Sequence, residues 1–228
     1  MHKLSKISII GLLLIFNFAL LTSINAQTGF KAIGIEGGWY VPSLSFWNED
    51  TFVNDWDEQF MGGIYGRGFI EIKLVKNISS RIGLGYWTQS LSQTNIPWDS
   101  ETRTDEMQLT IIPLTMDLLV YLDMKELKPI SLYGGIGWGI NFIQVKYTRT
   151  PSVSAPSVDE KSGKDYLGYL LAGFDFPIAS GFGSAIEFRY VFGEYIQQGV
   201  GSSDTIIDSE VSLGGPQISI AFKYLLDN

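Results

Sequence analysis

The side chains able to do chemistry in this 228-residue chain are almost all carboxylates, amines and guanidiniums. Cysteine is absent, and the single histidine is His2. A Ser–His or Asp–His catalytic arrangement needs a histidine whose pKa lies near neutral pH, and thiol catalysis needs a cysteine. If the first 26 residues are removed as a signal peptide, His2 goes with them, and the mature chain has neither imidazole nor thiolate ligands for a metal. Acids beside arginines remain, and these are more often structural ion networks than acid–base catalysts. We therefore predict that the protein is not an enzyme and carries no cofactor.

A glycine-rich stretch, Tyr133-Gly-Gly-Ile-Gly-Trp-Gly-Ile140, resembles at first sight a loop that binds phosphate. A dinucleotide fingerprint needs a helix after the glycines and a third glycine or alanine where this chain has Ile140. No Gly-Lys-Ser/Thr follows, which excludes a P-loop. From Pro129 to Val145, large apolar residues alternate with glycine or polar ones, as expected of a strand with one apolar and one small or polar face. The glycines therefore belong to a β-strand.

The first 26 residues have the pattern of a secretory signal peptide. Lys3 and Lys6 precede an apolar run over 7–21, and Thr-Ser-Ile-Asn-Ala26 provides a small-residue cleavage site. A membrane anchor is the alternative, but the run is shorter than the ~20 apolar residues of a spanning helix. We predict cleavage after Ala26 and one domain over 27–228. The formal net charge of −8 makes nucleic acid an unsuitable partner, because nucleic acid requires a basic face.

The two-residue period recurs through the rest of the chain and defines eight expected strands. They cover Phe30–Val41, Gly62–Val75, Arg81–Gln89, Ile112–Leu122, Pro129–Val145, Tyr166–Pro177, Gly181–Phe192 and Gln217–Tyr224. Long polar links at 43–61, 90–106, 147–164 and 194–210 alternate with short links at 76–80, 123–128 and 177–180. This alternation is typical of an up-and-down outer-membrane barrel with long loops outside and tight turns at the periplasmic end. The fold class is therefore all-β, an eight-stranded antiparallel up-and-down transmembrane β-barrel with both termini periplasmic.

The polarity of the two strand faces decides between a membrane barrel and a soluble one. An eight-stranded barrel has room only for packed side chains or one small ligand, and the apolar faces carry too much bulk for that interior. The small and charged faces should therefore line the lumen. The predicted polar lumen network consists of Glu36, Arg67, Glu71, Lys73, Arg81, Asp117, Asp175, Glu187, Arg189 and Lys223.

Two residue types test the strand assignments. Pro113 and Pro216 each remove a ladder donor, so each is expected to mark a bulge or a strand end. Aromatic residues near strand ends suit the girdles at membrane interfaces. The expected girdle tyrosines are Tyr86, Tyr121, Tyr133, Tyr190, Tyr195 and Tyr224.

The segment Ile112-Pro-Leu-Thr-Met-Asp-Leu-Leu-Val-Tyr121, a short turn and Pro129-Ile-Ser-Leu-Tyr-Gly-Gly-Ile-Gly137 together resemble the small outer-membrane β-barrel family of OmpX, OmpW and PorT types. The resemblance covers about residues 27–228. It implies a C-terminal assembly signal at Gln217, Ser219, Phe222 and Tyr224, with serine in place of the family's glycine and four residues following the last aromatic. It also implies periplasmic chaperones, the barrel-assembly machinery, and outer-membrane lipid and lipopolysaccharide as partners.

The first long link combines aromatic and acidic side chains. Its candidate surface contacts are Trp47, Phe52, Asp55, Trp56, Asp57 and Glu58. Exposed aromatics can anchor an extracellular partner, although they can equally pack against the barrel rim. The acids could also bind Ca²⁺ or Mg²⁺ through oxygen ligands, but the full calcium-loop pattern is missing.

Three roles follow for such a barrel. The first is a structural or surface-interaction protein with a filled polar lumen and long loops. The second, implied by the OmpW resemblance, is transport of small apolar molecules. The third, implied by the PorT resemblance, is an accessory part of a secretion machine. Because a conduit for apolar solutes needs an apolar interior, the predicted charged and glycine-lined lumen favours the first role, without steady ion conductance.

Overall fold

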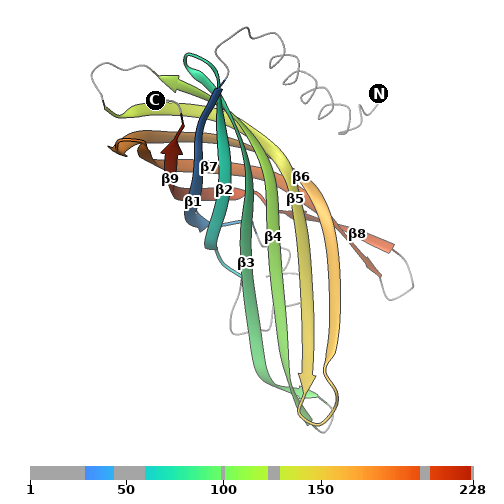
Figure 1. The fold of residues 1–228 in the computed structure, drawn as a ribbon. Helices are drawn as coiled ribbons and strands as arrows, with labels where there is room; N and C mark the ends of the chain where they lie inside the picture. Colours follow the sequence, from blue (N-terminus) through green and yellow to red (C-terminus); the bar gives the residue numbers. More distant parts are fainter. Residues whose placement is uncertain (1–28, 44–59, 99–100, 123–128, 201–205, 227–228) are drawn as a thin grey trace, which may run out of the picture.

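The computed structural model describes residues 29–43, 60–98, 101–122, 129–200 and 206–226, and these residues form strands and the turns between them (Figure 1). The strands are β1 (Gly29–Tyr40), β2 (Gly63–Val75), β3 (Ile78–Trp98), β4 (Glu101–Leu122), β5 (Ser131–Pro151), β6 (Ser157–Ala179), β7 (Phe182–Val200), β8 (Ile206–Ser212) and β9 (Gly215–Leu225). None of the described residues forms a helix long and apolar enough to cross a membrane.

The strands close into a barrel in which every pairing is antiparallel. Pairing runs in chain order from β1 to β7, and β9 joins β7 to β1. Strand β8 pairs only with the far end of β7, from Glu194↔Ser212 to Val200↔Ile206. Strand β8 therefore continues the line of β9 beyond the closed barrel and is not a ninth strand of the barrel wall. The predicted eight-stranded up-and-down barrel is confirmed.

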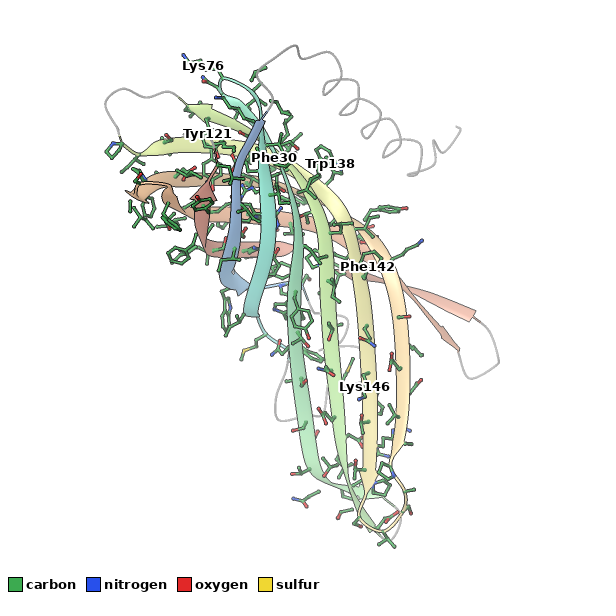
Figure 2. All side chains as sticks on the ribbon, viewed as in Figure 1. Phe30, Lys76, Tyr121, Trp138, Phe142 and Lys146 are labelled. Carbon is green, nitrogen blue, oxygen red and sulfur yellow. The ribbon has the colours of Figure 1, made fainter. Side chains whose placement is uncertain are left out.

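The apolar strand faces point outward, as predicted. Each barrel strand carries at least one large hydrophobic side chain that is more than two-fifths exposed, and Figure 2 shows side chains around the barrel wall. Examples from successive strands are Ile35, Ile64, Leu84, Leu114, Ile136, Leu170, Phe188 and Phe222. A soluble barrel would bury these side chains, so the structure supports the transmembrane type of barrel.

The outward apolar band has sharp limits. On β4 its residues run from Leu122 to Ile112, and the next outward residue is Thr110. On β5 the band ends at Phe142, and Gln144 follows. Ten residue steps at ~3.3 Å, with a tilt of ~40°, give a height of about 25 Å, which is that of a membrane-spanning barrel.

Strands β3 to β6 continue well beyond this band as one sheet, which we call the projecting sheet (88–98, 101–110, 144–151 and 157–164; Figure 1). The predicted long links at 90–106 and 147–164 are therefore wrong, because most of these residues are strand. Their alternation continues, with Leu91, Met107 and Val145 turned inward and serine, threonine, glutamine or lysine turned outward. Threonine and valine favour strands, so polarity alone was a poor loop signal here.

The two prolines behave differently. Pro216 is the second residue of β9, just after the break from β8, so the expected strand end is confirmed there. Pro113 lies inside β4, pairs with Asn141, and causes no bulge. On the β3 side the pairs run from Leu84↔Leu114 to Trp87↔Ile111 without a change of register. The missing N–H therefore removes a hydrogen bond from the ladder, and the pairing register stays the same on both sides of Pro113.

Candidate functional site

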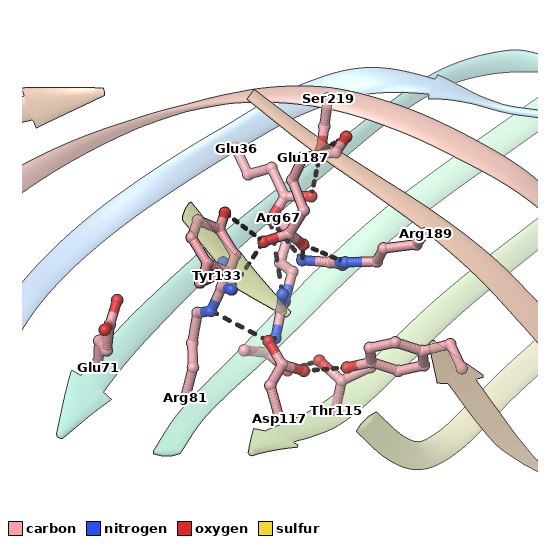
Figure 3. A network of polar contacts seen from close by, with 12 residues as sticks. Glu36, Arg67, Glu71, Arg81, Thr115, Asp117, Tyr133, Glu187, Arg189 and Ser219 are labelled. Atoms are coloured by element: carbon pink, nitrogen blue, oxygen red, sulfur yellow. Dashed lines mark hydrogen bonds and ion pairs between the residues drawn. The ribbon is translucent and has the colours of Figure 1, made fainter. Parts of the chain in front are cut away.

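Six charged side chains form a closed ring across the barrel interior, which we call the ion ring (Glu36, Arg67, Asp117, Arg81, Glu187 and Arg189; Figure 3). Acids and arginines alternate around it. Arg67 joins Glu36 (Nη1–Oε2, 3.5 Å) to Asp117 (Nη2–Oδ2, 3.0 Å). Arg81 joins Asp117 (Nε–Oδ2, 3.0 Å) to Glu187 (Nη2–Oε2, 2.7 Å). Arg189 contacts Glu187 and closes the cycle at Glu36 (Nη2–Oε2, 2.8 Å).

The strands without a charge in the ion ring reach it through hydroxyl and amide groups. Tyr133 on β5 donates to Glu187 Oε2 at 2.8 Å, and Tyr169 on β6 donates to Asp117. On β9, Ser219 and Gln217 donate to Glu36 Oε1 at 2.8 and 3.2 Å. Each of the eight barrel strands therefore contributes at least one side chain to a single polar network.

The ion ring is buried and electrically neutral. Each of its six side chains is at most 4 % exposed, and the three acids balance the three arginines. Burial of ions is costly unless each one is paired and hydrogen-bonded, and the ring meets that condition almost everywhere. Arg67 Nε and Arg81 Nε are the exceptions, since both are buried without a hydrogen-bond partner, although Arg81 Nε lies 3.0 Å from Asp117 Oδ2. These contacts support a structural role for the three carboxylates, because each one is already paired with arginine. Among the described residues, no open cavity leads from the surface to these carboxylates.

A second cluster lies between the ion ring and the lumen end away from the projecting sheet. Lys31 Nζ is 2.7 Å from Glu71 Oε1, which also accepts a 2.7 Å hydrogen bond from Tyr121. Lys223 Nζ is 2.6 Å from Asp175 Oδ2 and 3.8 Å from Glu71 Oε2. Lys31 is not among the predicted lumen residues, because a bulge between Phe30 and Ala32 turns its side chain inward against the simple alternation.

Lys73 lies outside both clusters. It is half-buried and lines an open cavity of about 330 Å³ at this end of the lumen, together with Lys31, Lys76, Ser79 and Tyr121. Among the predicted lumen residues, the structure thus joins Glu36, Arg67, Arg81, Asp117, Glu187 and Arg189 in one ring and Glu71, Asp175 and Lys223 in a neighbouring cluster.

Toward the projecting sheet the interior becomes apolar. We call this region the apolar plug; its buried residues are Tyr40, Phe60, Trp87, Leu91, Met107, Leu109, Ile111, Ile143, Val145, Leu167, Val191 and Leu213. Tyr40 and Trp87 meet edge to face with their ring centroids 6.3 Å apart. The expected charged and glycine-lined lumen is therefore wrong for this half. The signal was present in the sequence, since Met107, Leu109 and Ile111 share the strand face of Asp117.

Little space remains between the ion ring and the apolar plug. The cavity at their junction has a volume of about 30 Å³ and is bounded by Tyr65, Trp87, Asn141, Tyr169 and Arg189 among others. That volume suits about one water molecule. Side chains from both regions thus fill the described part of the lumen.

The inward glycines make room for this filling. Gly137 and Tyr169 are register partners, and a Cβ on Gly137 would overlap the tyrosine ring. Gly173 and Tyr133 form the same kind of pair, and a Cβ on Gly83 would overlap the Arg67 guanidinium. Inward glycines on β3, β5 and β6 thus make room for the large side chains that reach the ion ring.

The inner face of the projecting sheet holds a smaller polar group. Arg103 Nη2 lies 3.0 Å from Asp105 Oδ2, which also accepts a 2.6 Å hydrogen bond from Tyr147. Burial, together with the hydrogen bond to Asp105, raises the pKa of the Tyr147 phenol. No group of three or more His, Cys, Asp or Glu side chains among the described residues is arranged to hold a metal ion.

The other predicted positions divide into three cases. Phe222 and Tyr224 of the assembly signal point outward, whereas Gln217 and Ser219 contact Glu36. Tyr86, Tyr190 and Tyr224 are exposed, but Tyr121 and Tyr133 bind carboxylates inside the barrel, so the girdle prediction is wrong for these two. Trp47, Phe52, Asp55, Trp56, Asp57 and Glu58 lie outside the described residues, as do the side chain of Tyr195 and the predicted signal peptide.

Comparisons with known proteins agree with this architecture. No family model and no curated protein matches the chain. Among solved structures, Neisserial surface protein A matches with a TM-score of 0.53 and 11% identity, over 87% of this chain and 99% of that chain. A major outer membrane protein from Thermus thermophilus matches with a TM-score of 0.51 and 12% identity, over 87% and 100%. At these identities the likeness concerns the fold, which is that of small outer-membrane β-barrels.

Proposed function

We propose that this protein is an outer-membrane barrel with a sealed interior, which holds the projecting sheet at the cell surface for structural or surface-interaction purposes. The observation that carries the proposal is the continuous filling of the lumen by the ion ring and the apolar plug, with a cavity of only about 30 Å³ between them. A pore needs a connected aqueous path, and a solute conduit needs a vacant one.

The apolar plug bears on the alternative of transport for small apolar molecules. It supplies the kind of lining that such a conduit needs, but its side chains occupy the space themselves. On the other side of the ion ring the lumen is charged. These features favour the interaction role over transport. Nothing in the described residues supports the accessory role in a secretion machine.

Two measurements test the proposal. The protein from an outer-membrane fraction should migrate differently on gels with and without boiling, because a closed barrel resists detergent. In planar bilayers the protein should give no steady conductance. A porin of known conductance is the positive control. Nanosiemens open-state currents would contradict the sealed interior, and a soluble periplasmic protein without a boiling shift would contradict the membrane location.

The orientation needs its own test. Because the chain has no cysteine, a single Ser154→Cys variant offers one labelling position at the tip between β5 and β6. A membrane-impermeant maleimide should label it on intact cells. A cysteine at Asn77, in the turn between β2 and β3, should be labelled only after lysis. The opposite pattern would place the projecting sheet in the periplasm.

A further inference from the structure

We infer that the β7–β8 hairpin is a hinged flap, which closes onto the projecting sheet by extending the pairing of β6 with β7. The flap consists of 194–200 on β7 and 206–212 on β8. Closure would add two strands to the projecting sheet and cover the outer edge of β6, so the molecule would offer a partner different surfaces in its two states. The inference goes beyond the proposed function and does not depend on a sealed lumen.

The strand edges on the two sides of the split between β6 and β7 are open. Pairing between these strands ends at Leu167↔Gly193. Beyond this pair β6 continues with β5 as its strand partner, and β7 continues with β8, and Figure 1 shows the two running apart. Among the described residues, 157–164 of β6 and 195–200 of β7 therefore each present one edge that pairs with no strand. Such edges are the places where further strand pairing occurs.

Glycines lie where the flap meets the barrel. Gly193 is the last β7 residue paired with β6, and Gly214 and Gly215 stand at the change from β8 to β9. Gly215 has a φ of +154°, which L side chains rarely adopt, and a Cβ there would overlap the Val41 carbonyl oxygen. The Gly193 carbonyl accepts a 2.9 Å hydrogen bond from the Leu213 N–H, which holds the two hinge segments side by side. A hinge needs a few residues at element ends that absorb a change in φ and ψ, and glycine does so at the least steric cost.

The pairing of β6 with β7 can continue without bringing like charges together. Its register is constant from Pro177↔Gly183 to Leu167↔Gly193, apart from the shift after Pro177 at the turn. Continued at the same register, it would set each charged residue of outer β6 opposite an uncharged residue of β7. These pairs would be Asp165 with Tyr195, Lys164 with Ile196, Lys161 with Gly199 and Glu160 with Val200.

One pair of opposite charges favours closure. Glu194 would stand opposite Tyr166, which makes it a diagonal neighbour of Lys164, and both charged residues are exposed. Diagonal neighbours on a sheet lie about 7–8 Å apart, within reach of long side chains. Each new ladder hydrogen bond replaces bonds to water, so its net gain is small and pairing alone favours neither state strongly. The flap therefore has two accessible arrangements, between which a partner can select.

Cysteine pairs report closure directly, because the chain has no cysteine of its own. The positions of Ser162→Cys/Gln198→Cys become register partners only after closure. Ser162→Cys/Asp208→Cys is the matched control, because Asp208 pairs with Gln198 and would lie two strands away from Ser162. A disulfide needs Cα atoms within about 7 Å, whereas two strand spacings exceed about 9 Å.

The protein in an outer-membrane fraction is oxidised with copper phenanthroline, and the rate of cross-linking is followed on gels. The Ser162→Cys/Gln198→Cys pair should cross-link about tenfold faster than the control pair, because only the first pair comes within disulfide distance. Gln144→Cys/Ser162→Cys is the positive control, since these residues are already register partners on β5 and β6. The boiling shift of each variant reports that its barrel has formed.

Charge reversal tests the register. In the Ser162→Cys/Gln198→Cys background, Lys164→Glu should slow cross-linking about threefold because it would repel Glu194, and adding Glu194→Lys should restore the rate. Lys161→Glu is the control, because its register partner would be Gly199, and it should change the rate less than about twofold.

Equal rates for the Gln198 and Asp208 pairs would overturn the inference, as would a charge swap that fails to restore the rate. Spin labels provide a second measurement that needs no disulfide. Labels on Ser162→Cys/Gln198→Cys should show dipolar broadening of the kind given by the Gln144→Cys/Ser162→Cys pair, in proportion to the closed population. Spectra without broadening would also overturn closure of the flap.

Discussion

At the residue scale, the ion ring joins groups that cannot be left unpaired. Glu187 contacts Arg81 at 2.7 Å and also contacts Arg189, and Tyr133 donates to it. Removing one partner from a buried ion pair typically costs about 3–5 kcal/mol, because the remaining charge is buried without compensation. The contribution of each ring side chain to the free energy of unfolding therefore depends on whether its neighbours in the ring are present.

We expect Glu187→Gln to lower the free energy of unfolding by about 3 kcal/mol, because two buried arginines lose their shared carboxylate. The double variant Glu187→Gln/Arg81→Gln restores neutrality and should lose clearly less than the sum of the two single losses. Urea titration of the barrel in lipid vesicles, followed by tryptophan fluorescence, measures the free energy of unfolding of Glu187→Gln, of Arg81→Gln and of the double variant. Lys161→Gln is the surface control. Strictly additive losses would show that the ring is not an energetic unit.

The glycines that face the lumen allow a second test at this scale. Gly137→Ala should destabilise the barrel by about 1–3 kcal/mol, because the new methyl group overlaps the Tyr169 ring in a filled interior. Gly68→Ala is the matched control on the outward face, where a Cβ would have no atom within 4 Å. It should be neutral or stabilising by up to about 1 kcal/mol, since alanine restricts the unfolded chain. Equal effects of the two substitutions would argue against the close packing of glycine and tyrosine.

At the scale of elements, the extensions of the strands differ in what they support. The base of the projecting sheet carries Leu91, Met107, Leu109 and Val145 of the apolar plug, so it belongs to the core. The outer part of β7 and β8 pair only with each other and diverge from the projecting sheet (Figure 1). Their base is joined to the barrel, where Tyr40 donates a hydrogen bond to the Leu213 carbonyl and the Ser43 N–H donates to the Gly214 carbonyl.

Shortening this hairpin should therefore leave the barrel intact. Replacing 195–211 by Asn-Gly joins the register partners Glu194 and Ser212 through a two-residue turn suited to hairpins. The boiling shift and the urea midpoint should stay close to those of the wild type. A matching cut of the projecting sheet at its base, which removes Leu91 and Met107, should lower the midpoint. Loss of the boiling shift in the first variant would show that β8 supports the ring.

Alternation predicted most of these elements, and its failures have identifiable causes. The faces of Glu36, Arg67, Asp117 and Arg189 follow from counting by two along single strands. Lys31 escapes that count because a bulge shifts the register, and a bulge is decided by pairing with another strand. The ends of β3 to β6 were missed because their outward faces are as polar as loops. The closure of six charges into a ring depends on barrel geometry, which no single strand contains.

At the scale of the whole molecule, the barrel separates three tasks along its axis. The ion ring connects all eight barrel strands, and the apolar plug fills the half of the lumen nearer the projecting sheet. The projecting sheet itself extends beyond the apolar band. The sequence predicted the ring of strands and the direction of the apolar face from physical pattern alone. It could not predict how completely the lumen is filled, because that depends on which side chains meet from opposite walls, such as Tyr169 and Asp117.

The composition of the ion ring also bears on the order in which the barrel can be built. Glu36, Arg67, Arg81 and Asp117 come from β1 to β4 and already form an open chain of alternating charges without net charge. Glu187 and Arg189 arrive together on β7 as a neutral pair. Neither part of the ion ring therefore carries an excess charge before the barrel closes. Contacts between the halves form only at closure, so we expect them to slow the opening of the finished barrel more than they speed its assembly.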